Sequence, residues 1–194
     1  IVIALAMGLG TGILFGGLNG ILVTKGKVPP FIATLGTMTI GRGLALILSR
    51  GRPVSNVSDS FSFIGGGTLL GIPVPIIILI TMFVLCSLLL RKTLWGRYVY
   101  AVGGNQEAAR ASGINVNRIK LFVYTLCGVF SALGGIILAS RITTGQPNAG
   151  LGYELDAIAA AVIGGNSTSG GVGSITGTML GALLIGVMSN GLDM

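Results

Sequence analysis

The sequence contains no histidine, only five acidic residues and only two cysteines among its 194 residues. Most of the acids are scattered, and we interpret the one close pair, Glu154 and Asp156, as a solvated helix start, with a cation site as the minor alternative. Since Cys86 and Cys127 are single and lie inside apolar segments, we interpret them as packing residues and not as a disulfide or a metal pair. The residues therefore offer no catalytic constellation, and we expect neither an enzyme nor a cofactor.

Charge is also scarce, and its scarcity indicates a membrane protein. Only 9% of the residues are charged, compared with about 25% in ordinary soluble domains, and the mean hydropathy is +0.91. The net charge of +7 could suggest nucleic acid, but the basic residues lie at the ends of apolar segments, which is the positive-inside pattern. We therefore expect a lipid membrane and no nucleic acid among the partners.

Four apolar segments are long enough to cross a bilayer as helices, because twenty helical residues span about 30 Å. These segments are residues 1–24, 31–49, 72–90 and 121–140. Glycine is abundant, with 34 residues, which suits helices whose backbones approach closely. In the first segment Gly8, Gly12, Gly16 and Gly20 recur every four residues. We predict that this helix face packs closely against another helix.

The uncharged run at 157–192 is too long for one span and is interrupted by a turn rich in glycine and serine at 164–171. We predict a short helix, an irregular turn and then a helix from about Ile175. Within a membrane such a turn is tolerated only where protein or trapped water satisfies its backbone. The predicted fold class is an all-α, polytopic transmembrane helical bundle with a broken or re-entrant segment near 157–175 and a short cytoplasmic helix near 106–112.

The polar stretch 91–120 carries half of the chain's 12 basic residues and one acid, Glu107, which indicates a cytoplasmic loop. Asn105 can cap a short helix, Glu107 suits its positive first turn, and Gly113 can end it in the left-handed conformation. Since a helix this short is marginal in water, it needs a partner to pack against. The residues leave open whether the loop binds a partner protein or only orients the chain.

The loop resembles a known motif. Residues 103–114, GGNQEAARASGI, resemble the coupling motif of bacterial ABC importer permeases, which is Glu-Ala-Ala, three residues and Gly. The flanks at 26–54, 113–128 and 146–165 are similar to the membrane permease of ribose-type ABC importers, with xylose-type permeases close behind. The resemblance covers essentially the whole chain. No Lys-Ser/Thr pair follows the glycine turn at 164–174, so the chain shows no ATP-binding loop of its own.

The resemblance implies a permease of the bacterial inner membrane that forms the path for a monosaccharide such as ribose. Its expected partners are a cytoplasmic ABC ATPase, a periplasmic or extracellular sugar-binding protein and a second permease subunit, as a homodimer. The expected contacts with the ATPase are Asn105, Glu107, Ala108, Ala109, Arg110 and Gly113. Residues 1–194 would be a single permease domain, a fragment that lacks N-terminal helices and the last C-terminal helix. The alternatives are an ATPase-independent channel or ion-coupled transporter, and a structural membrane subunit.

Three groups of polar residues are candidates for further transport roles. Arg42 lies inside the second segment, where it either reaches the outer interface or faces a polar cavity. The polar residues of the glycine turn either line the sugar path or only satisfy freed backbone groups, and they are Asn166, Ser167, Thr168 and Ser169. Three arginines predicted to lie outside oppose the usual charge bias, so they dock the binding protein or contact lipid headgroups, and they are Arg50, Arg52 and Arg141.

Overall fold

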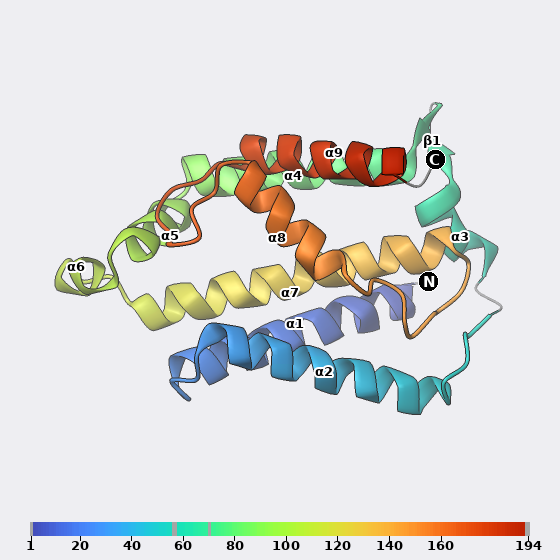
Figure 1. Cartoon of the computed structure of the whole chain (residues 1–194), viewed down its shortest axis with the longest axis horizontal. Helices are drawn as coiled ribbons and strands as arrows, with labels where there is room; N and C mark the ends of the chain where they lie inside the picture. Colours follow the sequence, from blue (N-terminus) through green and yellow to red (C-terminus); the bar gives the residue numbers. More distant parts are fainter. Residues whose placement is uncertain (1, 56–57, 70, 193–194) are drawn as a thin grey trace. The chain divides into compact units, whose positions relative to one another are not determined.

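The computed structural model describes residues 2–55, 58–69 and 71–192, which form helices joined by short connections (Figure 1). The long helices are α1 (Val2–Thr24), α2 (Pro30–Ser49), α4 (Val74–Lys92) and α7 (Val116–Arg141). The shorter ones are α3 (Asp59–Gly66), α5 (Leu94–Gly104), α6 (Gln106–Ala111), α8 (Tyr153–Ile163) and α9 (Ile175–Leu192). A small antiparallel pair, β1 (Thr68–Leu69) and β2 (Ile72–Pro73), precedes α4.

The four long helices are each long and apolar enough to cross a membrane, which confirms the predicted polytopic helical class. The predicted and observed helix boundaries differ most at α7, which begins at Val116, whereas the sequence predicts a span from residue 121. Its start is fixed by Asn115, whose side-chain oxygen accepts a hydrogen bond of 3.1 Å from the backbone N–H of Arg118. Arg118 and Lys120 do not end the helix, because long basic side chains can hold their charges in water while the backbone stays helical.

The chain divides into two compact units. The first contains Ile1–Thr81 and Lys120–Ala149, and the second contains Met82–Ile119 and Gly150–Met194. Helices α4 and α7 each begin in one unit and end in the other. Each unit therefore combines segments that are far apart in the sequence.

In the first unit, α1 packs on α7 through glycines. A Cβ at Gly12 would lie 2.5 Å from the carbonyl oxygen of Gly128, and one at Gly16 would lie 2.6 Å from that of Tyr124. A Cβ at Gly20 would come within 2.7 Å of a methyl group of Leu121. At Gly12 and Gly16 the obstructing atoms are backbone carbonyls, so only glycine permits this approach, whereas at Gly20 the nearest atom is the end of a side chain that can move. The close packing predicted from the four-residue spacing is confirmed.

The same unit also joins its two polar connections. The buried hydroxyl of Ser140 donates a hydrogen bond of 2.6 Å to the carbonyl of Phe61 and accepts one of 2.6 Å from the N–H of Gly65. Val54 and Gly145 exchange two backbone hydrogen bonds of 2.9 Å. The sequence predicts both connections on the outer side, and their direct contact means that they share one side of this unit.

In the second unit, α8 and α9 form a closely packed helical hairpin. The backbone of Gly164 contacts that of Gly177, and the backbone of Gly181 contacts that of Ala160, so that no Cβ would fit at these glycines. The 11 residues of α8 cover only about 16 Å at 1.5 Å per residue. The structure thus contains the predicted short helix, turn and second helix, while the depth of the turn in the membrane stays a prediction.

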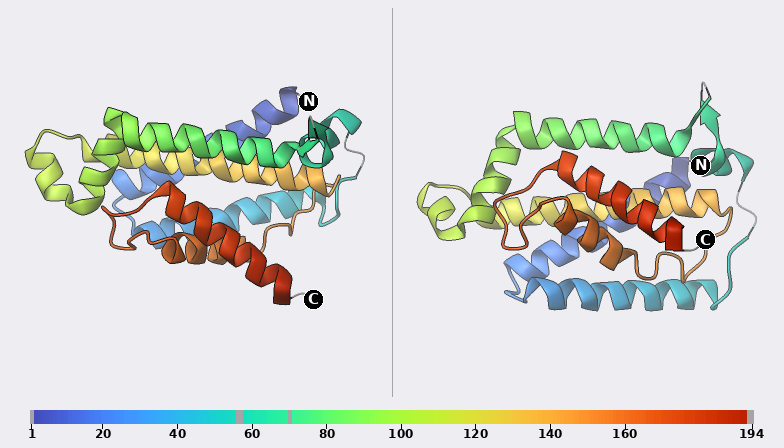
Figure 2. Two further views of the ribbon diagram at one scale, coloured as in Figure 1. Left: turned by 90° about the horizontal axis from the view of Figure 1, so that it is seen from above. Right: turned by 45° about the horizontal axis from the view of Figure 1, so that its top comes forward.

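Helix α5 leaves the end of α4 at a sharp corner (Figure 2). A single residue, Thr93, separates the two helices, and its side-chain oxygen accepts a hydrogen bond of 3.2 Å from the N–H of Gly96. A Cβ at Gly96 would lie 2.5 Å from the Cα of Leu90, so the first turn of α5 touches the last turn of α4. This contact fixes the direction in which the chain continues toward α6.

Candidate functional site

The candidate site is the short helix α6 with the residues that hold it. Its N-terminus is capped by Asn105, whose side-chain oxygen accepts hydrogen bonds from the N–H of Glu107 at 2.9 Å and of Ala108 at 3.0 Å. At this position the cap satisfies two backbone donors that the first turn would otherwise leave free. Glu107 lies in that first turn and is exposed. The predicted start of the helix is therefore confirmed.

The end of α6 follows the predicted pattern as well. Gly113 has a φ of +82°, and its N–H donates to the carbonyl of Arg110 at 2.9 Å. The N–H of Ile114 donates to the carbonyl of Ala109 at 3.0 Å, which completes the Schellman pattern of hydrogen bonds. The helix ends at Ala111, one residue earlier than predicted, because Ser112 already has a non-helical backbone.

Helix α6 rests on a small hydrophobic cluster of the same chain. Ala109 is 4% exposed and packs with Val102 of α5 and with Val116 and Ile119 of α7. Ala109 is one of the expected contacts with the ATPase, but its methyl group packs inside the unit, so its own contact with a partner stays a prediction. The cluster also supplies the packing partner that a six-residue helix needs, so α6 does not depend on another protein for its shape.

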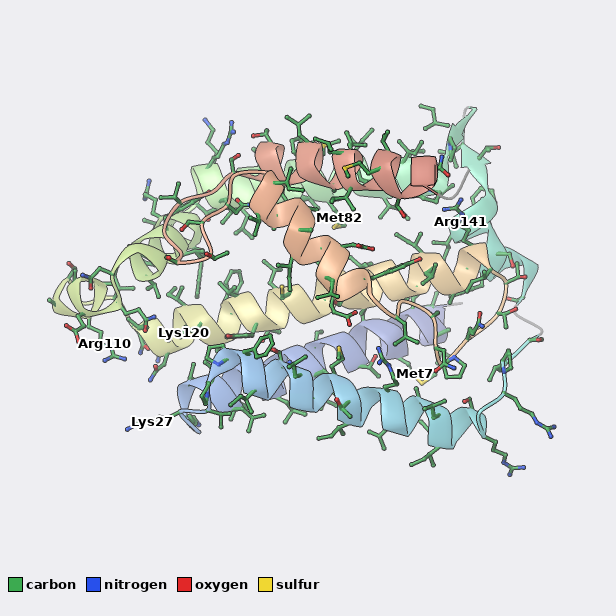
Figure 3. All side chains as sticks on the ribbon, viewed as in Figure 1. Met7, Lys27, Met82, Arg110, Lys120 and Arg141 are labelled. Atoms are coloured by element: carbon green, nitrogen blue, oxygen red, sulfur yellow. The ribbon has the colours of Figure 1, made fainter. Side chains whose placement is uncertain are left out.

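The opposite face of α6 is exposed and small. Glu107, Ala108, Arg110 and Ala111 are all exposed. Arg110 extends away from the other helices of its unit (Figure 3). A narrow helix with two exposed methyl groups and one charge of each sign can enter a groove of a partner, since alanine permits close approach of two backbones. The geometry therefore suits docking, with Gly113 exposed at the end of the helix.

The glycine turn between α8 and α9 is placed directly against the end of α5. A Cβ at Gly170 would lie 2.6 Å from the carbonyl oxygen of Gly103, and one at Gly171 would lie 2.6 Å from the Cα of Gly104. Gly170 and Gly171 have φ values of +90° and +77°, which side chains rarely adopt. The backbone of the turn therefore lies directly on the backbone of α5 at Gly103 and Gly104. Gly104 immediately precedes Asn105, the cap of α6.

A hydrogen bond secures this contact between the turn and α5. The hydroxyl of Tyr100 donates to the carbonyl of Gly173 at 3.0 Å. The sequence does not indicate Tyr100, Gly103 or Gly104 as residues of the site. The only signal in the sequence is the presence of two separate glycine pairs, and nothing in their spacing indicates that they meet.

Asn166 holds the turn together from inside. Its side-chain nitrogen donates to the carbonyl of Ala161 at 2.9 Å and to the hydroxyl of Thr178 at 2.6 Å. Its side-chain oxygen accepts from the N–H of Ser174 at 2.9 Å. Three hydrogen bonds to α8, to α9 and to the residue before α9 support the structural interpretation of Asn166. The neighbouring polar residues, Ser167, Thr168 and Ser169, are exposed.

The remaining candidates lie in the first unit. Arg42 is partly buried and lies inside α2. Arg50 ends α2 with a φ of +52° and, like Arg52 and Arg141, is exposed. The contact between Val54 and Gly145 joins the two connections that begin beside these three arginines, which sequence spacing alone could not indicate.

Comparison with known proteins decides the family. A family described as "Branched-chain amino acid transport system / permease component" matches residues 1–194. The chain belongs to this permease family. The permease is 53% identical to the ribose import permease protein RbsC of Bacillus subtilis (strain 168) over 178 residues, which cover 91% of this chain and 55% of that protein. It is 46% identical to the protein of the same name from Escherichia coli (strain K12) over 196 residues, covering 99% and 61%.

A third relative broadens the comparison. The permease is 44% identical to the L-arabinose transport system permease protein AraH of Escherichia coli (strain K12) over 176 residues, which cover 91% of this chain and 54% of that protein. The chain thus spans little more than half the length of these relatives. No solved structure gives a significant match. The resemblance to ribose-type permeases is confirmed.

Proposed function

We propose that this permease is the membrane subunit of an ATP-driven sugar importer and forms the path for a monosaccharide such as ribose. The names of its relatives, which are ribose and arabinose permeases, support this substrate class. The four candidate spans support a multi-pass protein, and we propose the bacterial inner membrane as its location. The permease itself carries out no covalent chemistry in this proposal.

The observation that carries the coupling role is the rigid presentation of α6. The helix is capped by Asn105, ended by Gly113 and anchored through Ala109, while its other face stays exposed. A structure that is fixed on one side and open on the other suits a groove in a cytoplasmic ABC ATPase. We propose that Glu107, Ala108 and Arg110 contact that ATPase. Ala109 would instead hold α6 in place by packing against α5 and α7.

The contact between α5 and the glycine turn gives this docking helix a connection to the membrane helices. Displacement of α6 by the ATPase would act on Gly104, which directly precedes its cap, and from there on Gly171. Gly103 and Gly104 contact the turn through backbone atoms. No side chain lies between the two backbones that could change its rotamer and absorb the movement. We propose that this contact carries motion from the docking helix to the α8–α9 hairpin.

The other partners follow from the same proposal. A sugar-binding protein would dock on the outer side, where Arg50, Arg52 and Arg141 are exposed in one unit. A second permease subunit, as a homodimer, would complete the path. Arg42 and the exposed residues Ser167, Thr168 and Ser169 remain candidates for lining it, whereas the three hydrogen bonds of Asn166 favour a structural role there.

Reconstitution tests the function directly. The permease, its ATPase and its binding protein are assembled in liposomes, and entry of radiolabelled D-ribose is measured with ATP, with a non-hydrolysable analogue and without the ATPase. We expect uptake only when ATP, the ATPase and the binding protein are all present. Ribose entry that persists without the ATPase would instead indicate a channel or an ion-coupled transporter.

A matched pair of variants tests the role of α6. Ala108→Leu enlarges the exposed face of the helix and should weaken copurification of the ATPase without changing the melting temperature of the permease. Ala101→Leu makes the same change at an exposed alanine of α5 and should leave copurification intact. Equal copurification with both variants would contradict docking through α6.

A further inference from the structure

Helix α5 continues from a membrane-spanning helix but does not share its direction. It leaves the end of α4 at the Thr93 corner, where the hydroxyl of Thr93 donates to the carbonyl of Leu89 at 2.5 Å and its oxygen caps α5. When α4 crosses the bilayer, a helix that turns away within one residue of its end is held along the membrane surface. This places the first turns of α5 at the level of the lipid headgroups.

The two faces of α5 differ in what they contact. Gly96 and Val102 are buried against the rest of the unit. Three large residues near the start of the helix face outward, with exposed fractions of 56% for Leu94, 47% for Trp95 and 38% for Tyr98. Because residues 94 and 98 are one helical turn apart and residue 95 lies beside them, the three form one continuous patch.

Basic side chains surround this patch. Arg91 and Lys92 end α4 beside it, Arg97 lies within it along the helix, and all three are exposed. None of them forms an ion pair with an acid in the described ranges, and the sequence has no acid between Asp59 and Glu107. Three positive charges next to an exposed tryptophan and tyrosine match the composition of helices that lie in the membrane interface.

We propose that residues 91–98 form a contact face for anionic phospholipids. Leu94 and the rings of Trp95 and Tyr98 insert at the headgroup boundary, and Arg91, Lys92 and Arg97 bind lipid phosphates. An anionic headgroup is favoured over an acidic protein surface because one occupant must satisfy both the apolar patch and the charges, and the corner at Thr93 holds the helix against the bilayer. The face is separate from the exposed side of α6 and does not depend on the transported substrate.

The chain has a single tryptophan, Trp95, so its fluorescence reports on this face alone. The permease is reconstituted in vesicles of phosphatidylcholine and phosphatidylglycerol in which one lipid or the other carries bromine, a quencher that acts at short range. We expect brominated phosphatidylglycerol to quench Trp95 more than the same mole fraction of brominated phosphatidylcholine. The Trp95→Phe protein provides the background signal.

Charge variants show whether the selectivity comes from the proposed residues. Arg91→Gln, Lys92→Gln and Arg97→Gln combined should remove the difference between the two lipids while leaving substantial quenching by both. Each basic residue near an anionic surface contributes roughly a fivefold preference, so the loss should be well above measurement error. Arg50→Gln combined with Arg52→Gln, which changes exposed arginines at the end of α2, should leave the difference unchanged.

Three results would overturn the proposal. Absence of quenching by either lipid would show that protein covers Trp95, and equal quenching by both lipids in the unmodified permease would show that the contact is not selective for charge. Quenching that disappears when the ATPase is bound would show that the partner protein, and not lipid, is the occupant in the assembled transporter. Selectivity for the anionic lipid is measured on the unmodified permease alone. The proposal can therefore be tested even if the triple variant folds poorly.

Discussion

Two glycine-rich regions of this permease use glycine for different reasons. In the contact between α1 and α7, the glycines are ordinary helical residues, and what matters is the space that a side chain would take. In the turn between α8 and α9, Gly170 and Gly171 lack that space and also have positive φ values. The first region depends on close helix approach alone, whereas the second depends on both close approach and a backbone conformation that few residues adopt.

Gly113 completes this comparison because glycine is needed there for its backbone conformation and not for the space that a side chain would take. Its φ is +82°, yet nothing lies within 4 Å of a Cβ built on it. Gly16 is the opposite case, in which glycine is needed for space alone. It is helical, and a Cβ there would lie 2.6 Å from the carbonyl oxygen of Tyr124. Gly171 combines the two requirements. Substitutions at the three positions therefore separate the two uses of glycine.

The largest effect is expected for Gly171→Val. Overpacking costs about 1–3 kcal/mol, and the left-handed conformation adds about 1–2 kcal/mol. We expect the melting temperature of the purified permease to fall and ATP-driven ribose uptake to be lost. Gly186→Val in α9, where a Cβ meets nothing within 4 Å, is the control and should have a much smaller effect. Similar losses in both variants would refute a special role for the contact with Gly104.

The second-largest effect is expected for Gly16→Ala, which tests whether α1 needs the space of a missing side chain at its contact with α7. The methyl group would force α1 away from α7 at a cost of about 1–3 kcal/mol. Gly10→Ala makes the same change on the same helix where nothing lies within 4 Å, and it should be neutral or slightly stabilising because alanine favours the helix. Thermal unfolding of both variants measures the difference. A stable Gly16→Ala protein would mean that the two helices can separate without loss.

The sequence predicted those features that follow from local rules. Among the described residues these features are four helices long and apolar enough to cross a membrane, the cap at Asn105, the left-handed Gly113 and the glycine face of α1. Each depends on neighbouring residues or on a simple period. The burial of Ala109 was not predicted, because every alanine of a short helix looks alike until the packing of the surrounding chain is known.

Contacts between distant residues could not be predicted. Ser140 and Gly65 are 75 positions apart, and Tyr100 and Gly173 are 73 apart. No periodic pattern relates such pairs, so a single sequence gives no reason to join them. The contact between the glycine turn and α5 is of this kind, because nothing in the sequence indicates that Gly103 and Gly104 meet Gly170 and Gly171.

The third prediction tests conformation alone, through Gly113→Val. A β-branched residue opposes the left-handed backbone at a cost of about 1–2 kcal/mol and would change the direction of the chain after α6. We expect membrane insertion to remain and ATP hydrolysis and sugar uptake to fall together in reconstituted complexes. Gly113→Asn should retain most activity, because asparagine tolerates this conformation better than valine. Normal coupling in the valine variant would show that the loop only orients the chain.

The smallest effect is expected for Glu107→Gln, which changes neither space nor backbone conformation. An acid in the first turn stabilises a helix by about 0.3–1 kcal/mol, so uptake should fall by roughly fivefold at most. Two measurements distinguish its possible roles. A lower melting temperature of the isolated permease would assign Glu107 to the stability of α6. Weaker, less salt-sensitive binding of the ATPase with unchanged melting would assign it to an ion pair with the partner. If the melting temperature, the affinity for the ATPase and uptake all stay at wild-type values, Glu107 has no part in coupling, and docking rests on the shape of α6 that Asn105, Ala109 and Gly113 maintain.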